Sequence, residues 1–63
     1  MDRYVIRDAD GNPCTSFDNL DEALEQFDSY DNDGLLNKGD EIYDTVEKCS
    51  VYVFNGIYCD WVI

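Results

Sequence analysis

Acidic residues are concentrated in the middle of this 63-residue chain, and that concentration limits what the chain can fold into. Eleven of its fifteen Asp and Glu residues lie in residues 18–47, where Lys38 is the one basic residue, so this segment carries −10 of the formal net charge of −11. Like charges this close repel one another and oppose folding. A net charge of magnitude about 2 to 8 is enough to keep a small domain soluble. The excess indicates a surface that is kept for a basic partner.

The length of the chain predicts a single compact domain over residues 1–63. A domain of this size buries only about 60% of the surface that its unfolded chain exposes, so the core must be thin. The sequence contains no apolar run of about 18 residues and no secretory signal, which favours a soluble protein of the cytoplasm. Its negative charge is repelled by anionic lipid and by nucleic-acid phosphate, so we expect no binding to membranes or directly to nucleic acid.

The three cysteines form no Cys-x-x-Cys pair, and the chain has no histidine to complete a zinc site. We expect free thiols in a reducing cytoplasm. A disulfide from Cys14 to Cys49 or to Cys59 is the alternative, and a role for any of the three stays open.

The first half of the chain predicts two strands followed by a helix. Residues 3–7 alternate as a strand, residues 8–13 have the Asp, Asn, Gly and Pro content of a turn, and residues 14–17 continue as a return strand. A helix is expected to start at Asp18 or Asn19, because Asn19 and Glu22 have the spacing of a capping box. One apolar stripe follows at helical spacing: Leu20, Ala23, Leu24, Phe27 and Tyr30.

The second half predicts further strands. Residues 41–47 alternate like a strand, and a short helix with Ile42, Tyr43 and Val46 inward is the alternative. Residues 50–54 and 57–63 flank Asn55-Gly56, which predicts a hairpin with a two-residue turn that places Phe54 opposite Ile57. The fold class expected is therefore α+β: a small antiparallel sheet of four to five short strands, with a C-terminal hairpin, packed on one amphipathic helix.

Neither catalysis nor metal binding is favoured by the residues present. The chain lacks histidine, a Gly-rich phosphate loop and a nucleophile beside a recognisable base, so we expect no enzymatic activity and no cofactor. Residues 31–34 resemble the middle of a calcium-binding EF-hand loop, but Ser29 and Asp40 stand where its first Asp and its last Glu belong. Two Asp- and Gly-rich turns explain the pattern, and we expect no metal site.

Several helix carboxylates have no local structural explanation. Acids in the first turn complement the helix dipole, whereas Glu25 and Asp28 lie beyond it and Asp31 lies at the negative end. Placement against local stability is typical of functional sites. The partner-binding candidates are Asp21, Glu22, Glu25, Asp28, Asp31 and Asp33, with Asp40, Glu41 and Asp44 as a second row.

In its size, its acidity and its carboxylates on a helix and adjacent loops, the whole chain resembles the small phage-encoded DNA mimics that block bacterial defence, the anti-CRISPR and anti-restriction proteins. No shared motif carries this resemblance. It implies an inhibitor in the bacterial host cell, a monomer or weak dimer, whose carboxylates occupy the basic DNA-binding surface of a CRISPR effector subunit or a restriction enzyme and block target DNA.

The alternative is an interaction module of another kind, such as an antitoxin, that binds through aromatic residues of the sheet. Tyr52, Phe54 and Trp61 share one face of the expected hairpin, and aromatic side chains are frequent interface anchors.

Overall fold

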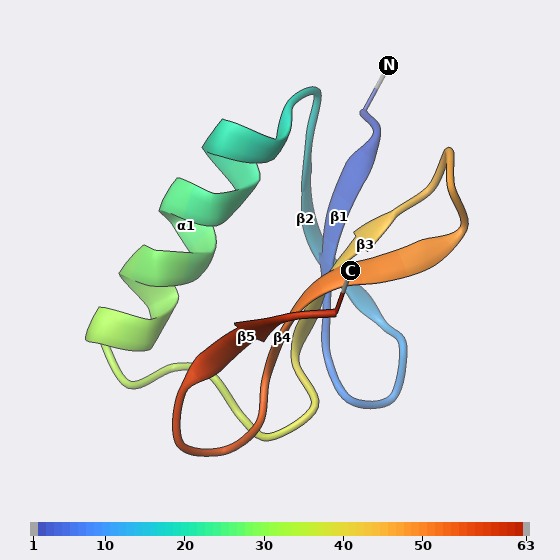
Figure 1. The fold of residues 1–63 in the computed structure, drawn as a ribbon. Coiled ribbons are helices and arrows are strands. Elements are labelled where there is room, and N and C mark those ends of the chain that lie inside the picture. The colour runs from blue at the N-terminus through green and yellow to red at the C-terminus, as the bar shows by residue number, and fades with distance from the viewer. Residues whose placement is uncertain (1, 63) are drawn as a thin grey trace.

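The computed structural model describes residues 2–62 as one helix packed on a five-stranded antiparallel sheet, which confirms the expected α+β fold (Figure 1). The elements in chain order are β1 (Tyr4–Arg7), β2 (Pro13–Phe17), α1 (Leu20–Asn32), β3 (Glu41–Asp44), β4 (Cys49–Phe54) and β5 (Cys59–Trp61).

The strands are ordered β2-β1-β3-β4-β5 across the sheet. Both β2 and β3 are antiparallel to β1, so they are parallel to each other, and α1 makes the connection between them. The helix lies against β1, β2 and β3 on one face of the sheet. It reaches β4 through the rings of Phe27 and Tyr52, which meet edge to face with centroids 5.7 Å apart. Among residues 2–62, the opposite face of the sheet has no covering layer.

Helix α1 begins where the capping pattern predicts. Asn19 is the N-cap: its side-chain oxygen accepts a hydrogen bond from the backbone N–H of Glu22 at 2.9 Å, and its amide donates to the Glu22 carboxylate at 3.2 Å. Such a cap satisfies a backbone donor that the first turn leaves without an intrahelical partner. The apolar stripe faces the sheet, with Ala23 and Phe27 fully buried.

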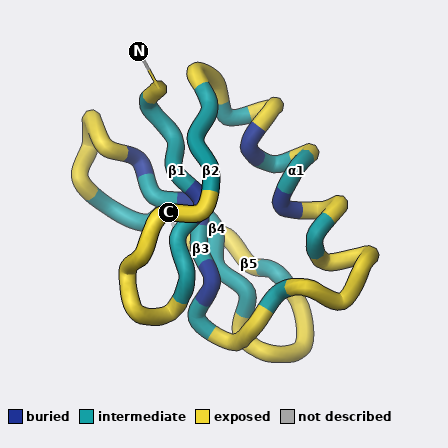
Figure 2. The backbone as a smooth tube through the Cα atoms, turned by 180° about the vertical axis from the view of Figure 1, so that it is seen from behind, coloured by how far each residue is buried: buried dark blue, intermediate teal, exposed yellow. Residues whose placement is uncertain are grey.

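The core is thin, as the length of the chain requires. Ile6 of β1 and Ile42 of β3 are cross-strand partners, and both are buried beneath Ala23 and Phe27. Figure 2 shows buried stretches on α1 and in the central strands, while the loops are exposed. This single layer of contact holds the helix to the sheet.

The expected strand over residues 41–47 is correct only for its first part, and the helical alternative is wrong. β3 ends at Asp44, and residues 45–48 form a turn. Asp44 causes the break, because its Oδ1 accepts hydrogen bonds from the N–H groups of Val46 at 2.9 Å and Glu47 at 3.2 Å. Val46 is consequently 63% exposed rather than inward.

The C-terminal hairpin is present, but the register expected for it is wrong. Phe54 is opposite Cys59 instead of Ile57, so the loop has four residues, 55–58. The side-chain oxygen of Asn55 accepts hydrogen bonds from the N–H groups of Ile57 and Tyr58, both at 2.9 Å, and these bonds close the wider loop. A shift of two residues leaves the side chains of Cys59, Asp60 and Trp61 on their expected faces.

Candidate functional site

Six carboxylates on α1 and at its C-terminal end form what we call the acidic helix surface: Asp21, Glu22, Glu25, Asp28, Asp31 and Asp33. All six are exposed. No ion pair joins any of them to another of residues 2–62. The structure therefore places the first row of predicted residues together on one element with their charges uncompensated.

The acidic helix surface covers the solvent side of α1 and both of its flanks. Asp21, Glu25 and Asp28 are spaced at i, i+4 and i+7, which places them in one row along a helix. On the flank toward β2, Glu22 and Glu25 line a shallow pocket of about 310 Å³ whose wall includes Phe17.

The other flank faces β4 and β5. Burial raises the pKa of the Cys59 thiol, and the carboxylates of Asp31 and Asp28 raise it further. The pKa of Tyr52 is raised by burial and by the same two carboxylates. Asp28 and Asp31 are thus close enough to the aromatic part of the sheet to act on its titratable groups.

The C-terminal half of the acidic helix surface opposes the helix dipole. Asp28 and Asp31 lie in the last turns of α1, Asp33 is its C-cap, and the last turn contains no basic residue. Each negative charge at that end destabilises a helix by about 0.3 to 1 kcal/mol. The structure gives none of these three carboxylates a stabilising ion pair among the described residues.

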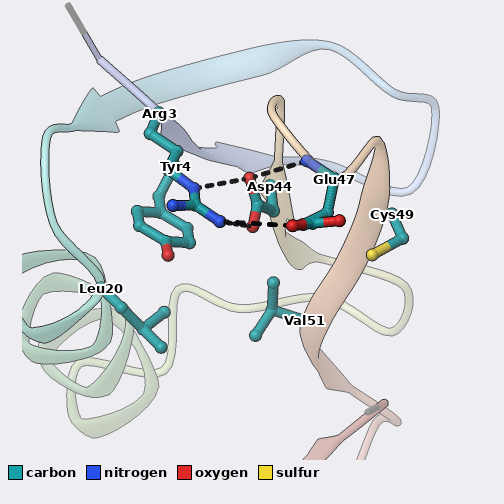
Figure 3. Close-up of a pocket in the computed structure, with 7 residues that line it drawn as sticks. All are labelled: Arg3, Tyr4, Leu20, Asp44, Glu47, Cys49 and Val51. Carbon is teal, nitrogen blue, oxygen red and sulfur yellow. Dashed lines mark hydrogen bonds and ion pairs between the residues drawn. The ribbon is translucent and has the colours of Figure 1, made fainter.

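The second row of predicted residues is arranged differently, because Asp44 is directed inward. Its side chain is 5% exposed and accepts hydrogen bonds from Nε and Nη2 of Arg3 at 3.0 and 2.8 Å (Figure 3). Arg3, together with the N–H groups of Val46 and Glu47, holds the pKa of Asp44 down at about 2. Asp44 is a structural counterion.

Glu41 is engaged on the uncovered face of the sheet. It accepts hydrogen bonds from Nε of Arg7 at 2.9 Å and from the hydroxyl of Ser50 at 2.8 Å, and it forms an ion pair with Arg7. The Arg7 guanidinium also stacks on Tyr43, with Cζ 3.8 Å from the ring centroid. This cluster joins β1, β3 and β4.

Asp40 is buried, with 9% of its surface exposed, at the start of β3. Asp40, Glu41 and Asp44 do not continue the row of exposed carboxylates, because Asp40 and Asp44 are buried and Glu41 is paired with Arg7. We leave these three residues out of the acidic helix surface.

The basic residues explain why the acidic helix surface stays uncompensated. Arg3 and Arg7 are both used inside the sheet. The side chain of Lys38 packs beside Gly56, where an added Cβ would lie 3.5 Å from it, and Lys48 occupies the turn before β4 with a φ of 58°. Within residues 2–62, neither lysine forms an ion pair with a helix carboxylate.

The aromatic residues predicted as an alternative contact surface belong largely to the core. Tyr52 and Phe54 are partly buried and pack against the core residues. Trp61 lies at the margin, 50% exposed, with its ring centroid 4.7 Å from that of Tyr52. Of these three aromatic side chains, Trp61 is thus the exposed one.

The EF-hand-like segment does not form a loop of cation ligands. Asp31 and Asn32 belong to α1, and the segment ends in strand β3 rather than in a second helix. Across residues 2–62, no three Asp, Glu or Cys side chains converge in a metal-binding arrangement. The described chain also has no helix long and apolar enough to cross a membrane.

Sequence reasoning missed the two arginines as site-defining residues. Arg3 reaches Asp44 over a separation of 41 positions, and Arg7 reaches Glu41 over 34. The available signal was their spacing at i and i+4 in the alternating run of residues 3–7, because side chains an even number of positions apart lie on one side of a strand, where both could act as counterions. The chain matches no protein-family model, and comparison with curated proteins and with solved structures found no match.

Proposed function

We propose that the acidic helix surface binds the positively charged DNA-binding surface of a protein and blocks DNA from it by mimicking phosphate charge. The observation that carries this proposal is the set of exposed, uncompensated carboxylates at the end of α1 where they weaken the helix. These carboxylates do not stabilise the fold, because both arginines pair with other acids. Residues that oppose local stability are typical of functional sites.

The spacing of the charges supports the same function. Five carboxylates from Asp21 to Asp31 occupy ten residue steps of α1. A helix rises about 1.5 Å per residue, which gives one charge per about 3.8 Å of axis. One strand of duplex DNA has a phosphate every 3.4 Å or so of axis. The average density of charge along α1 is therefore close to that of one DNA strand, although the single steps run from about 1.5 to 4.5 Å and Glu22 and Asp31 lie on opposite flanks of the helix.

The rigidity of α1 supports competition with a stiff ligand such as DNA. The helix is capped by Asn19 and anchored by the fully buried Phe27, so its carboxylates keep fixed relative positions. Four of the six residues are Asp, whose short side chain loses little conformational freedom on binding. Both features reduce the entropy cost of association.

The resemblance to phage counter-defence proteins supplies the class of target. We propose that the target is a bacterial CRISPR effector, or else a restriction enzyme, and that inhibition takes place in the cytoplasm of the host cell. Within this proposal the chain itself does not bind DNA, because its surface repels phosphate.

A gel-shift experiment with a candidate effector and its target DNA tests the proposal. The wild-type chain should release the DNA, and Glu25→Lys/Asp28→Lys should not. The matched control is Asp10→Lys/Asp60→Lys, which changes the net charge equally at two exposed positions outside α1 and should still inhibit. Equal inhibition by both folded double variants would reject DNA mimicry.

The salt dependence of inhibition distinguishes binding by the carboxylates from binding by the aromatic residues of the sheet. The aromatic alternative remains a candidate because Trp61 is 50% exposed. A complex held by carboxylates weakens as sodium chloride screens the charges. Inhibition that is insensitive to salt and lost in Trp61→Ala would assign binding to the aromatic edge instead.

A further inference from the structure

Asp40 has a buried carboxylate with one oxygen left without a hydrogen bond. The residue is 9% exposed. Its Oδ2 accepts a hydrogen bond from the N–H of Asn37 at 2.9 Å, whereas its Oδ1 is buried and finds no donor among residues 2–62. Burying a charged oxygen without a partner destabilises a protein. Such an oxygen takes its hydrogen bond from outside the chain, from a water molecule or from a ligand.

A cavity of about 190 Å³ lies beside Asp40. It is lined by Asp40 and five neighbours: Ile6, Cys14, Tyr30, Leu35 and Leu36. Leu35 is 60% exposed and Cys14 is exposed, so the cavity reaches the surface on their side. Sites for cofactors and drug-sized ligands are larger, about 300 to 1,000 Å³. An apolar cavity of about 150 Å³ accommodates a benzene molecule. The cavity at Asp40 therefore suits a single long side chain.

The charges around the cavity select a cation. Tyr30 belongs to the last turn of α1, where the helix dipole is negative and no basic residue compensates it. The aromatic ring of Tyr30 also favours a cation, and the Asp40 carboxylate favours one more strongly. The remaining walls are aliphatic. A ligand with an apolar stem and a cationic end matches both parts of the site.

The larger cavity of about 470 Å³ in Figure 3 shows how the chain treats a buried carboxylate when it supplies the partner itself. There, Arg3 donates two hydrogen bonds to Asp44. At Asp40 the nearest basic residue in sequence is Lys38, and its side chain lies against Gly56 instead. No cation among the described residues pairs with Asp40.

We propose that the cavity between the end of α1 and the start of β3 receives a lysine or arginine side chain of the basic partner, with the Asp40 carboxylate binding its cationic group. The aliphatic stem packs between Leu36, Ile6 and Tyr30, and Leu35 moves aside at the mouth. That the side chain comes from a DNA-binding protein rests on the proposed function above. The preference of the cavity for a cation rests on the cavity alone.

Fragments that imitate the two side chains test the site directly. We expect n-butylguanidinium and n-butylammonium to cause saturable shifts of the Leu36, Asn37 and Asp40 amide signals in ¹H–¹⁵N spectra at millimolar concentration. The neutral n-pentanol should cause none, and Asp40→Asn should abolish the shifts. Asp60→Asn, which neutralises an exposed carboxylate elsewhere, should retain them.

The melting temperature separates a binding role from a structural one. Asn at position 40 still offers an oxygen to the N–H of Asn37 and removes the uncompensated charge. Asp40→Asn should therefore melt at the same temperature as the wild-type chain or higher, although it has lost the cation site. A lower melting temperature for Asp40→Asn, cation-induced shifts that persist in it, or equal shifts with n-pentanol would overturn the proposal.

The same variant distinguishes this inference from the proposed function. In the effector assay, Asp40→Asn should inhibit DNA binding about tenfold less well while keeping its fold. Unchanged inhibition by Asp40→Asn would overturn the proposed role of the cavity and leave DNA mimicry intact. Fragment binding that depends on Asp40, combined with normal inhibition by Glu25→Lys/Asp28→Lys, would reject mimicry through the helix and support the cavity.

Discussion

Arg3, just before β1, donates two hydrogen bonds to Asp44, the last residue of β3: Nε to Oδ1 at 3.0 Å and Nη2 to Oδ2 at 2.8 Å. The same carboxylate oxygen, Oδ1, accepts the N–H groups that start the turn after β3. One side chain thus fixes a strand end, a turn and the position of an arginine. Its loss would affect all three.

Acid should destabilise the protein through Asp44. The folded-state pKa of Asp44 is about 2, below the ordinary aspartate value of 3.8, so its ionised form stabilises the fold at pH values above 3.8. That stabilisation is lost as the pH falls through the interval between the two values. The melting temperature, followed by circular dichroism, should therefore fall in this interval, and the fall should be smaller in Asp44→Asn. An identical acid profile for both proteins would contradict this assignment.

Screening the acidic helix surface should stabilise the protein. Residues 18–33 contain seven carboxylates and no basic residue. The Debye length is about 10 Å at 0.1 M salt, so sodium chloride weakens the repulsion between neighbours on one helix. The melting temperature should rise between low and moderate salt. An unchanged melting temperature would mean that these charges do not repel measurably.

The stabilisation gained by changing one helix carboxylate to lysine should depend on the position of that residue along α1. Asp28→Lys places a cation near the negative end of the helix dipole and should stabilise the fold by about 0.5 to 1 kcal/mol. Asp21→Lys relieves similar repulsion but removes a favourable acid from the first turn, so it should gain less. Urea denaturation of the two variants gives the comparison. Equal gains would show that the dipole does not contribute.

Phe27 should be the residue on which the core depends most. It is fully buried and meets Tyr52 edge to face. Phe→Ala changes in cores cost about 3 to 5 kcal/mol, which is comparable with the whole stability of a small domain. Phe27→Ala should be largely unfolded by circular dichroism. Val46→Ala, in the exposed turn, should stay within about 0.5 kcal/mol of the wild-type chain.

The four-residue hairpin loop should depend on the Asn55 side chain. Asn55→Ala removes the acceptor for two backbone N–H groups and should cost about 1 kcal/mol in urea denaturation. Gly56→Ala should cost a similar amount or more, because φ at Gly56 is +101°. A two-residue turn would not use the hydrogen bond from Tyr58 to Asn55. If Asn55→Ala left the stability unchanged, the result would favour the two-residue turn with Phe54 opposite Ile57.

Local patterns in the sequence predicted the elements whose cause is local. The helix start at Asn19 and the stripe through Phe27 follow from capping and periodicity within a few residues. The hairpin register could not be predicted, because Asn-Gly fits a two-residue turn equally well and the side chain of Asn55 decides for the longer loop. The end of β3 at Asp44 likewise depends on a carboxylate that is paired with Arg3, a residue 41 positions earlier in the chain.

In the candidate site, too, some features could be predicted from local sequence and others could not. The exposed carboxylates of α1 could be assigned from helical spacing, because position on a helix determines exposure when the apolar stripe is known. Asp40, Glu41 and Asp44 could not, because their burial depends on pairing across the sheet and on the strand order β2-β1-β3-β4-β5. The contacts of Arg3 with Asp44 and of Arg7 with Glu41 could not be predicted either, because the paired residues are 41 and 34 positions apart in the sequence.

The uncompensated helix gives the whole molecule an uneven distribution of charge. Residues 18–33 hold −7 of the net −11, since seven acids and no basic residue lie there, and α1 occupies one side of the sheet. Such a molecule has a permanent electric dipole moment. The field of a cationic surface exerts a torque on that dipole and turns the helix toward it before the two molecules touch. Orientation in the field would thus raise the fraction of encounters that begin with α1 foremost.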